Sequence, residues 1–179
     1  KGISCFIIEK GTQGVSAGKP EEKLGIRASD TCELYFDQVR VSSDNLIGDL
    51  GQGFKIALST LDGGRIGIAS QALGIAQASL ENSIQYSKDR VQFGKPISNN
   101  QAIQFKLADM GMEIEAARLL IYKAASEKDR KLNFSSLASM AKVYTSEVAM
   151  RASTQCVQIH GGYGYIKESG VERLMRDAK

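Results

Sequence analysis

The sequence predicts a mainly α-helical fold, an antiparallel four-helix-type bundle preceded by a few strands from the end of a β domain. Two observations predict it. Apolar residues recur at steps of three and four positions over most of the chain after Gly53. The preceding stretch instead alternates strand-forming runs with glycine-rich loops. We therefore expect residues 1–47 to be the C-terminal part of a β domain, and residues 48–179 to be most of a helical bundle domain.

The predicted strands lie in two runs near the N-terminus. Residues 3–8 are apolar and lie between a glycine and an acidic and basic pair, which predicts a short buried strand. Residues 31–41 alternate roughly and are rich in β-branched and aromatic side chains, while residues 11–20 have the glycines and proline of a loop. Two or three strands are not stable alone, so we expect them to be the end of a larger β domain.

Three long helices and a shorter one follow. The first is expected from about Gly53 to Lys88, roughly 50 Å at 1.5 Å per residue, and its many inward alanines and glycines let another helix approach closely. Asn133 or Ser135 is the expected N-cap of the third helix, and a fourth helix is expected to begin near Ser169. The apolar stripes of the second and third helices are Ile103, Leu107, Met110, Ile114, Ala117, Ile121 and Ala124, and Leu137, Met140, Tyr144, Val148, Ala152 and Cys156.

Composition excludes several classes of function. The net charge is +3 without a basic run or stripe, which argues against nucleic-acid binding. No apolar run is long enough for a membrane span. Cys5, Cys32 and Cys156 have no paired spacing, which suggests reduced thiols in an intracellular compartment. The chain opens with Lys1 directly in a strand-like run, so we expect it to be cut at its start, where a targeting segment would not be visible.

Some apparent motifs do not carry a function. Gly94-Lys95 resembles the end of a P-loop, but Asp89 stands where the first glycine is needed. Cys156 and His160, four residues apart, are compatible with a thiol–base dyad or a metal pair. With one histidine in the chain and no further ligands nearby, we expect no metal site and give the dyad little weight.

Four other features exceed what core packing requires. The pair Gly63-Gly64, between Asp62 and Arg65, costs a helix about 1–2 kcal/mol relative to alanine. It indicates either a kink or close helix contact, or a backbone left bare for a ligand. Arg90 follows Asp89, so it is either a solvated surface residue or the ligand of a phosphate.

The remaining two features begin and end helices. Gln101 and Gln104 open the second helix, where a side-chain amide can cap the backbone or meet a ligand. The segment Gln158–Tyr165 closes the third helix; Gly161 alone would serve as a C-cap, but three glycines and two tyrosines exceed that need.

Together these segments resemble the acyl-CoA dehydrogenase family over essentially the whole chain. The resemblance extends from Gly2-Ile3-Ser4-Cys5-Phe6 through Lys23-Leu24-Gly25-Ile26-Arg27 to Arg176-Asp177-Ala178-Lys179. The stretches Leu61–Ala69 and Gln71–Ala76 resemble the short-chain, or butyryl-CoA, branch in particular.

The resemblance implies an FAD site and a thioester site. Arg90, Phe93 and Gln101 match positions that hold the pyrophosphate and adenosine part of FAD. The segment that matches the contact with the FAD of a neighbouring subunit consists of Gln158, Ile159, His160, Gly161 and Gly162. This implies dimers that pair into tetramers. The stretch that matches the lining of the acyl-CoA site consists of Asp62, Gly63, Gly64 and Arg65.

No catalytic residue is expected within the 179 residues. Some relatives carry the basic glutamate at the position of Gly64, whereas the short-chain branch carries it a few residues beyond the Arg-Asp-Ala-Lys motif that ends this chain at Lys179. The base removes a proton beside the thioester carbonyl, and a hydride leaves the adjacent carbon for the flavin. We therefore expect the fragment itself to be inactive.

The function implied is FAD-dependent dehydrogenation of short-chain acyl-CoA to 2-enoyl-CoA in fatty-acid β-oxidation, with electrons passed to an electron-transfer flavoprotein. The implied location is the cytoplasm of a bacterium or the mitochondrial matrix of a eukaryote. Two alternatives stay open: a branched-chain dehydrogenase or flavin oxidase of the same superfamily, and a non-catalytic helical assembly module. A series of acyl-CoA substrates separates the first from the main hypothesis, and a carboxylate beyond Lys179 argues against the second.

Overall fold

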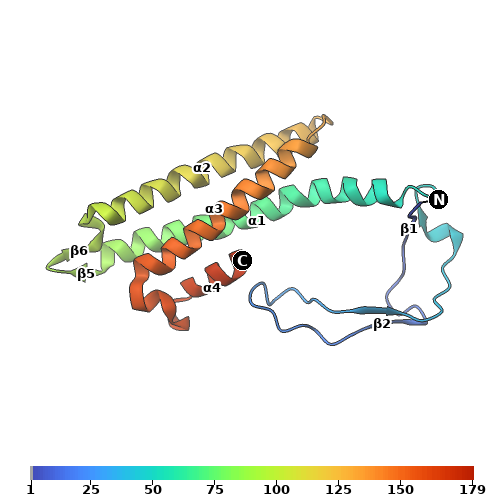
Figure 1. Cartoon of the computed structure of the whole chain (residues 1–179), viewed down its shortest axis with the longest axis horizontal. Coiled ribbons are helices and arrows are strands. Elements are labelled where there is room, and N and C mark those ends of the chain that lie inside the picture. Colours follow the sequence, from blue (N-terminus) through green and yellow to red (C-terminus); the bar gives the residue numbers. More distant parts are fainter. Residues whose placement is uncertain (1) are drawn as a thin grey trace. The chain divides into compact units, whose positions relative to one another are not determined.

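The computed structural model describes residues 2–179 (Figure 1). The chain divides into two compact units, one ending at Leu61 and the other comprising Asp62–Lys179. Helix α1, Gly53–Asp89, crosses this division as one unbroken helix. The tandem glycines Gly63 and Gly64 therefore do not interrupt it.

The N-terminal unit holds two small antiparallel ladders. Strand β1, Cys5–Phe6, pairs with β4, Leu46–Ile47, so that Cys5 faces Ile47. Strand β2, Val15–Ala17, pairs with β3, Leu34–Phe36. A 3₁₀ turn precedes β4, and the Ser42 hydroxyl accepts a hydrogen bond from the N–H of Asp44 at its start.

The prediction of a buried strand over residues 3–8 is wrong in this structure. Only Cys5–Phe6 is a strand, and the side chains of Ile3 and Ile7 are 64% and 55% exposed. Residues 31–41 likewise give only the three exposed strand residues Leu34–Phe36. Strand-forming composition was sufficient for pairing, but over residues 2–61 no second layer covers either ladder, so no hydrophobic side chain there is buried.

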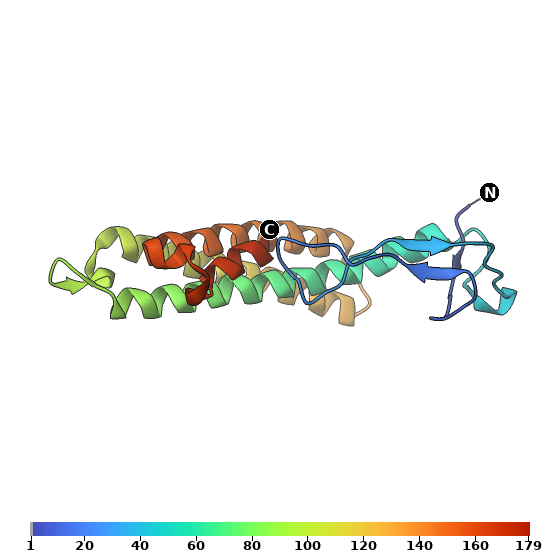
Figure 2. The same ribbon diagram turned by 90° about the horizontal axis from the view of Figure 1, so that it is seen from below.

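The helical prediction is confirmed. After α1 come α2, Gln101–Asp129, α3, Ser135–His160, and the short α4, Val171–Ala178. Within the helical unit, Figures 1 and 2 both show α2 and α3 lying beside the second part of α1, with successive long helices running in opposite directions. The expected N-cap of α3 is corrected: Phe134 occupies the cap position, and the side chain of Asn133 accepts a hydrogen bond from the Ser135 N–H at 3.3 Å.

Small residues dominate the core of this bundle. The stripes predicted for α2 and α3 lie inside it, except that Met140 is 48% exposed. The buried members of the core are Ala69, Leu73, Ala76, Met110, Ile114, Ala117, Ile121, Ala124, Ala141, Val148, Ala149, Ala152 and Ile159. So many alanines allow helix backbones to approach closely, as the sequence indicated.

A row of buried serines adds to this close packing. Ser79, Ser83 and Ser87 repeat every four residues on α1 and are at most 1% exposed. The Ser79 and Ser83 hydroxyls donate to the carbonyls four residues earlier, at 2.8 and 2.7 Å. Because these two hydroxyls donate within their own helix, α1 buries them with their donors satisfied.

Candidate functional site

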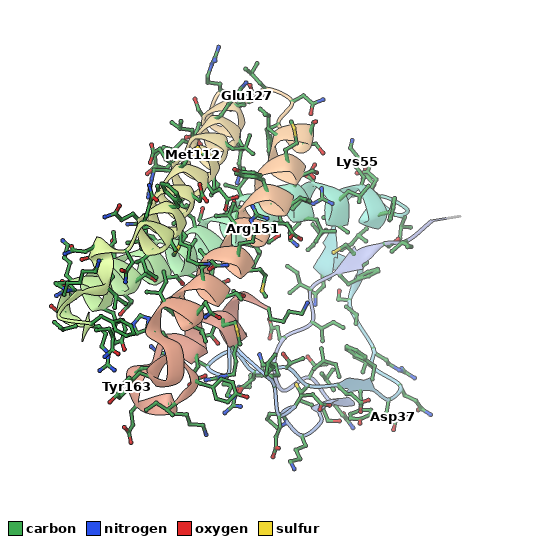
Figure 3. All side chains as sticks on the ribbon, turned by 60° about the vertical axis from the view of Figure 1, so that its left-hand side comes forward. Asp37, Lys55, Met112, Glu127, Arg151 and Tyr163 are labelled. Carbon is green, nitrogen blue, oxygen red and sulfur yellow. The ribbon has the colours of Figure 1, made fainter. Side chains whose placement is uncertain are left out.

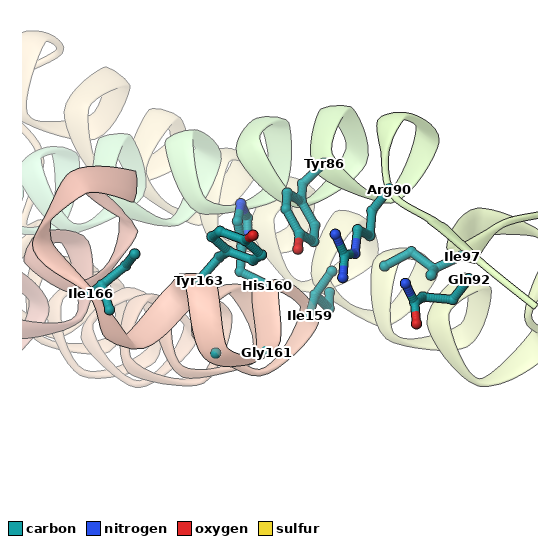
Figure 4. A pocket seen from close by; sticks show the side chains of 10 residues that line it. Tyr86, Arg90, Gln92, Ile97, Ile159, His160, Gly161, Tyr163 and Ile166 are labelled. Atoms are coloured by element: carbon teal, nitrogen blue, oxygen red, sulfur yellow. The ribbon is translucent and has the colours of Figure 1, made fainter.

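An open cavity of about 420 Å³ lies where the second end of α1, the hairpin after it and the end of α3 meet (Figure 4). The hairpin consists of β5, Val91–Gln92, and β6, Lys95–Pro96. The residues that line the cavity are Tyr86, Arg90, Gln92, Ile97, Ile159, His160, Gly161, Gly162, Tyr163 and Ile166. Its wall is therefore mainly aromatic and aliphatic, with one permanent cation.

Arg90 is that cation, and its backbone is held from both sides. Its N–H donates to the Tyr86 carbonyl at 2.8 Å, and its own carbonyl accepts from the Ile97 N–H at 2.9 Å. The carboxylate of Asp89 instead accepts a hydrogen bond from Gln85 at 2.8 Å. Over residues 2–179 no ion pair joins Arg90 to a carboxylate. A guanidinium without a counter-ion in a cavity wall is suited to binding an anion such as phosphate.

His160 forms part of the same wall, packed against α1. Its ring stacks on Tyr86 with centroids 4.2 Å apart and planes 24° from parallel. Its Nδ1 lies 2.8 Å from the Cys156 carbonyl, which can only accept, so Nδ1 carries a proton. This bond and the stack fix the orientation of the only histidine in the chain.

The thiol–base dyad considered for Cys156 and His160 does not form. Their Sγ and Nδ1 atoms are 3.8 Å apart, but Nδ1 already donates to a carbonyl and cannot act as a base. Burial raises the pKa of the Cys156 thiol, and a hydrogen bond with Ser83 offsets this only in part. Cys156 is therefore a buried neutral thiol.

Three glycines follow α3, and a different feature of the structure explains each of them. Gly161 has φ +58° and ψ −135°, a conformation that side-chain-bearing residues avoid. A Cβ on Gly164 would lie 2.4 Å from the Val157 carbonyl oxygen, so this position accepts no side chain. Gly162 meets neither constraint, because a Cβ there would contact nothing within 4 Å. Its bare backbone borders the cavity without serving the bundle.

The segment Asp62–Arg65 lies elsewhere on α1. Asp62 pairs with Arg65 one turn later. A Cβ on Gly64 would meet nothing within 4 Å, so close helix packing does not explain this glycine; at Gly63 it would meet only the flexible amine of Lys128, at 3.3 Å. The segment is more than twenty residues before Arg90, which is over 30 Å at 1.5 Å per residue. The two sets of predicted residues therefore form two separate places on this chain.

A sequence profile described as "Acyl-CoA dehydrogenase, C-terminal domain" matches residues 51–179. The chain belongs to the acyl-CoA dehydrogenase family. It is 57% identical to "Acyl-CoA dehydrogenase, short-chain specific" of Megasphaera elsdenii over 99% of this chain and 46% of that protein. The solved structure of butyryl-CoA dehydrogenase from Megasphaera elsdenii superimposes with a TM-score of 0.98 at 57% identity, again over 99% of this chain and 46% of the other.

A second solved structure is described as "Electron transferring flavoprotein of Acidaminococcus fermentans: Towards a mechanism of flavin-based electron bifurcation". A chain in it matches with a TM-score of 0.96 at 52% identity, over 98% of this chain and 46% of its own length. The chain thus spans about half the length of these relatives that it matches.

The structure brings together five of the residues that the family resemblance assigns to the cofactor. Arg90 and the run Ile159–Gly162 line the one cavity. Phe93, Gln101 and Gln158 do not line it. Phe93 is 99% exposed at the tip of the hairpin, where Phe93 and Gly94 both have positive φ, as a two-residue turn requires.

Sequence reasoning did not place five further residues in the cavity: Tyr86, Gln92, Ile97, Tyr163 and Ile166. For Tyr86 a signal existed, because it lies four residues before Arg90 and so shares its helix face. Tyr163 stands between Gly162 and Gly164, and its own position gave no hint of a contact with Arg90. Gln104 also proved structural, since its side chain donates to the Ser98 carbonyl at 2.9 Å.

Residues 2–179 contain neither a cluster of metal-ligating side chains nor a helix suited to crossing a membrane. No three histidine, cysteine, aspartate or glutamate side chains in this range gather in a group that could hold a metal ion. Within the same range, no helix combines the length and the apolar character that crossing a membrane requires.

Proposed function

We propose that the full-length protein carrying this chain is an FAD-dependent dehydrogenase of short-chain acyl-CoA thioesters, and that this chain binds the nucleotide end of the flavin. The observation that carries the proposal is the cavity itself. It presents an unpaired guanidinium and a bare glycine backbone in a chain that is 57% identical to a short-chain-specific relative.

The residues present fit the diphosphate of a dinucleotide. The guanidinium of Arg90 offers several N–H donors to phosphate oxygens, and at Gly162 no side chain limits the approach of a ligand to the backbone. FAD, when bound, would supply the redox chemistry of the reaction. Because Arg90 and Gly162 border one cavity, we propose that both segments contact one flavin, the neighbouring subunit's FAD that the resemblance assigns to Gln158–Gly162.

We assign the thioester to the segment Asp62–Arg65, where Gly64 leaves the helix surface bare and only the flexible end of the Lys128 side chain lies near Gly63. The ion pair with Asp62 orients Arg65 along the helix. Gly64 holds no carboxylate, so we propose that the base comes from residues outside the 179 described by this sequence.

Exposed apolar side chains support assembly into a dimer of dimers. Phe105, Met112 and Leu119 repeat every seven residues on α2 and are 58%, 67% and 61% exposed (Figure 3 labels Met112). A separate apolar groove of about 700 Å³ is lined by Leu120, Ser139, Met140, Val143, Tyr144, Glu147 and Arg151. A patch of this kind is typical of an interface between subunits.

The test is to purify the full-length protein and measure flavin absorbance and acyl-CoA oxidation with electron-transfer flavoprotein as acceptor. We expect bound FAD and the highest kcat/KM with butyryl-CoA in a series from four to sixteen carbons. Preference for a branched thioester, or fast turnover with oxygen alone, would favour the sister enzymes. A colourless protein that refuses FAD would favour the non-catalytic assembly module.

A further inference from the structure

Arg90 makes a contact with the ring of Tyr163, a residue that the family resemblance does not assign to the flavin site. The Arg90 Cζ atom lies 5.5 Å from the centroid of the Tyr163 ring. Figure 4 shows the guanidinium on the cavity side, between Tyr163 and the hairpin residues Gln92 and Ile97. This is the distance of a cation–π contact. It joins the end of α1 to the 3₁₀ segment that follows α3.

The backbone of Tyr163 is fixed by the two glycines that need to be glycine. Gly161 turns the chain out of α3 with its positive φ, and Gly164 packs against the Val157 carbonyl where no side chain fits. Tyr163 lies between them in the 3₁₀ segment Gly161–Tyr165. Although its side chain is 54% exposed, its Cα is therefore held at a defined place beside Arg90.

Arg90, in contrast, is fixed only at its backbone. Its N–H and carbonyl are both hydrogen-bonded, but over residues 2–179 no carboxylate pairs with its guanidinium. A free arginine side chain loses rotamer entropy when a ligand immobilises it. The Tyr163 ring restricts the guanidinium before a ligand arrives, without the counter-charge that a carboxylate would place in the anion's path.

We propose that Tyr163 is a positioning residue that holds Arg90 in the cavity in the pose that takes the diphosphate of a dinucleotide. This inference rests on the proposed function, since it assigns a role within the same FAD site. It differs from a direct stacking role, in which the Tyr163 ring would contact the ligand itself. The two roles are distinguished by whether the loss of FAD affinity on replacing Tyr163 requires Arg90 to be present.

The experiment measures FAD binding to the apo form of the full-length protein by flavin fluorescence, with Tyr163→Phe, Tyr163→Leu, Arg90→Ala and the double variant. Tyr165→Leu is the matched control, because Tyr165 is 86% exposed in the same segment and does not line the cavity. We expect Tyr163→Leu to raise the Kd for FAD about threefold to tenfold. Tyr163→Phe, which keeps the ring, and Tyr165→Leu stay within about twofold of wild type.

The double variant that combines Tyr163→Leu with Arg90→Ala distinguishes the positioning role from the direct stacking role. If Tyr163 acts through Arg90, adding Tyr163→Leu to Arg90→Ala raises the Kd by no more than about twofold. Additive losses would overturn the positioning role, as would a Tyr163→Leu protein that binds FAD like wild type. Both of those results leave the proposed function standing. A wild-type protein that binds no FAD would refute the proposed function and this inference with it.

Discussion

Both units of this chain contain apolar side chains, but the helical unit buries many of them and residues 2–61 bury none. In the helical unit, Ile114, Val148 and Ala152 are at most 2% exposed, whereas Leu34 and Phe36 of the N-terminal unit are 61% and 57% exposed. Hydrophobic residues stabilise a fold only when a second layer removes them from water. The helical unit supplies that layer from its own helices, and residues 2–61 do not.

The largest difference is expected in stability, from one large apolar residue of each unit. In this chain Ile114→Ala should lower the free energy of unfolding by about 2–5 kcal/mol, because it leaves a cavity in the core. Phe36→Ala, its counterpart on exposed β3, should change it by less than about 0.5 kcal/mol. Urea unfolding followed by helical circular dichroism measures both. Equal losses would show that the N-terminal unit contributes a core of its own to this transition.

A second contrast separates binding from stability within the helical unit. In the full-length protein, Arg90→Ala removes a charge-assisted hydrogen bond and should weaken FAD about tenfold to a hundredfold, or about 1.5–3 kcal/mol. The apo form should lose no more stability than its exposed cation–π contact with Tyr163 supplies, about 0.5–1 kcal/mol, because over residues 2–179 Arg90 forms no ion pair. The control is Arg130→Ala at the far end of α2, an exposed residue. Unchanged flavin retention would make Arg90 a surface residue.

How far the sequence predicted these regions follows from the range of the interactions involved. Helix α1 was expected over Gly53–Lys88 and runs over Gly53–Asp89, because helical periodicity is a local property that survives into the bundle. The predicted burial of the strands was wrong, because it depended on a second layer of structure, which composition does not predict. The cavity was half predicted: Arg90 and Gly162 stand in unusual local sequence, whereas Tyr163 acquires its role only through the fold.

A third contrast concerns two glycines two residues apart. Gly164→Ala should destabilise the chain by about 1–3 kcal/mol, because the new Cβ would be 2.4 Å from the Val157 carbonyl oxygen. Gly162→Ala meets nothing within 4 Å and should change stability by less than about 0.5 kcal/mol. Because Gly162 lines the cavity, flavin affinity of the full-length protein should fall instead. If Gly162→Ala left FAD binding intact, the bare backbone there would not be a ligand surface.

The smallest expected effect depends on pH and belongs to the last helix of the helical unit. The Arg176 Nε donates to the Glu172 carboxylate at 2.6 Å, and this hydrogen bond lowers the pKa of Glu172 below its ordinary value of 4.5. Since the folded pKa is the lower one, the pair stabilises the fold above pH 4.5, and this contribution disappears as the pH falls through the folded pKa.

Glu172→Gln should therefore lower the free energy of unfolding at pH 7 by about 0.3–0.5 kcal/mol, the usual value of such a helix pair. Wild type and variant should converge as the pH falls below 4.5 and through the folded pKa of Glu172, in urea titrations at matched ionic strength. Phe36→Ala, which removes no charge, should show the same offset from wild type at every pH. A difference for Glu172→Gln that grew on acidification would have the wrong sign for a carboxylate stabilised in its ionised form, and would show that Glu172 is protonated in the native helix.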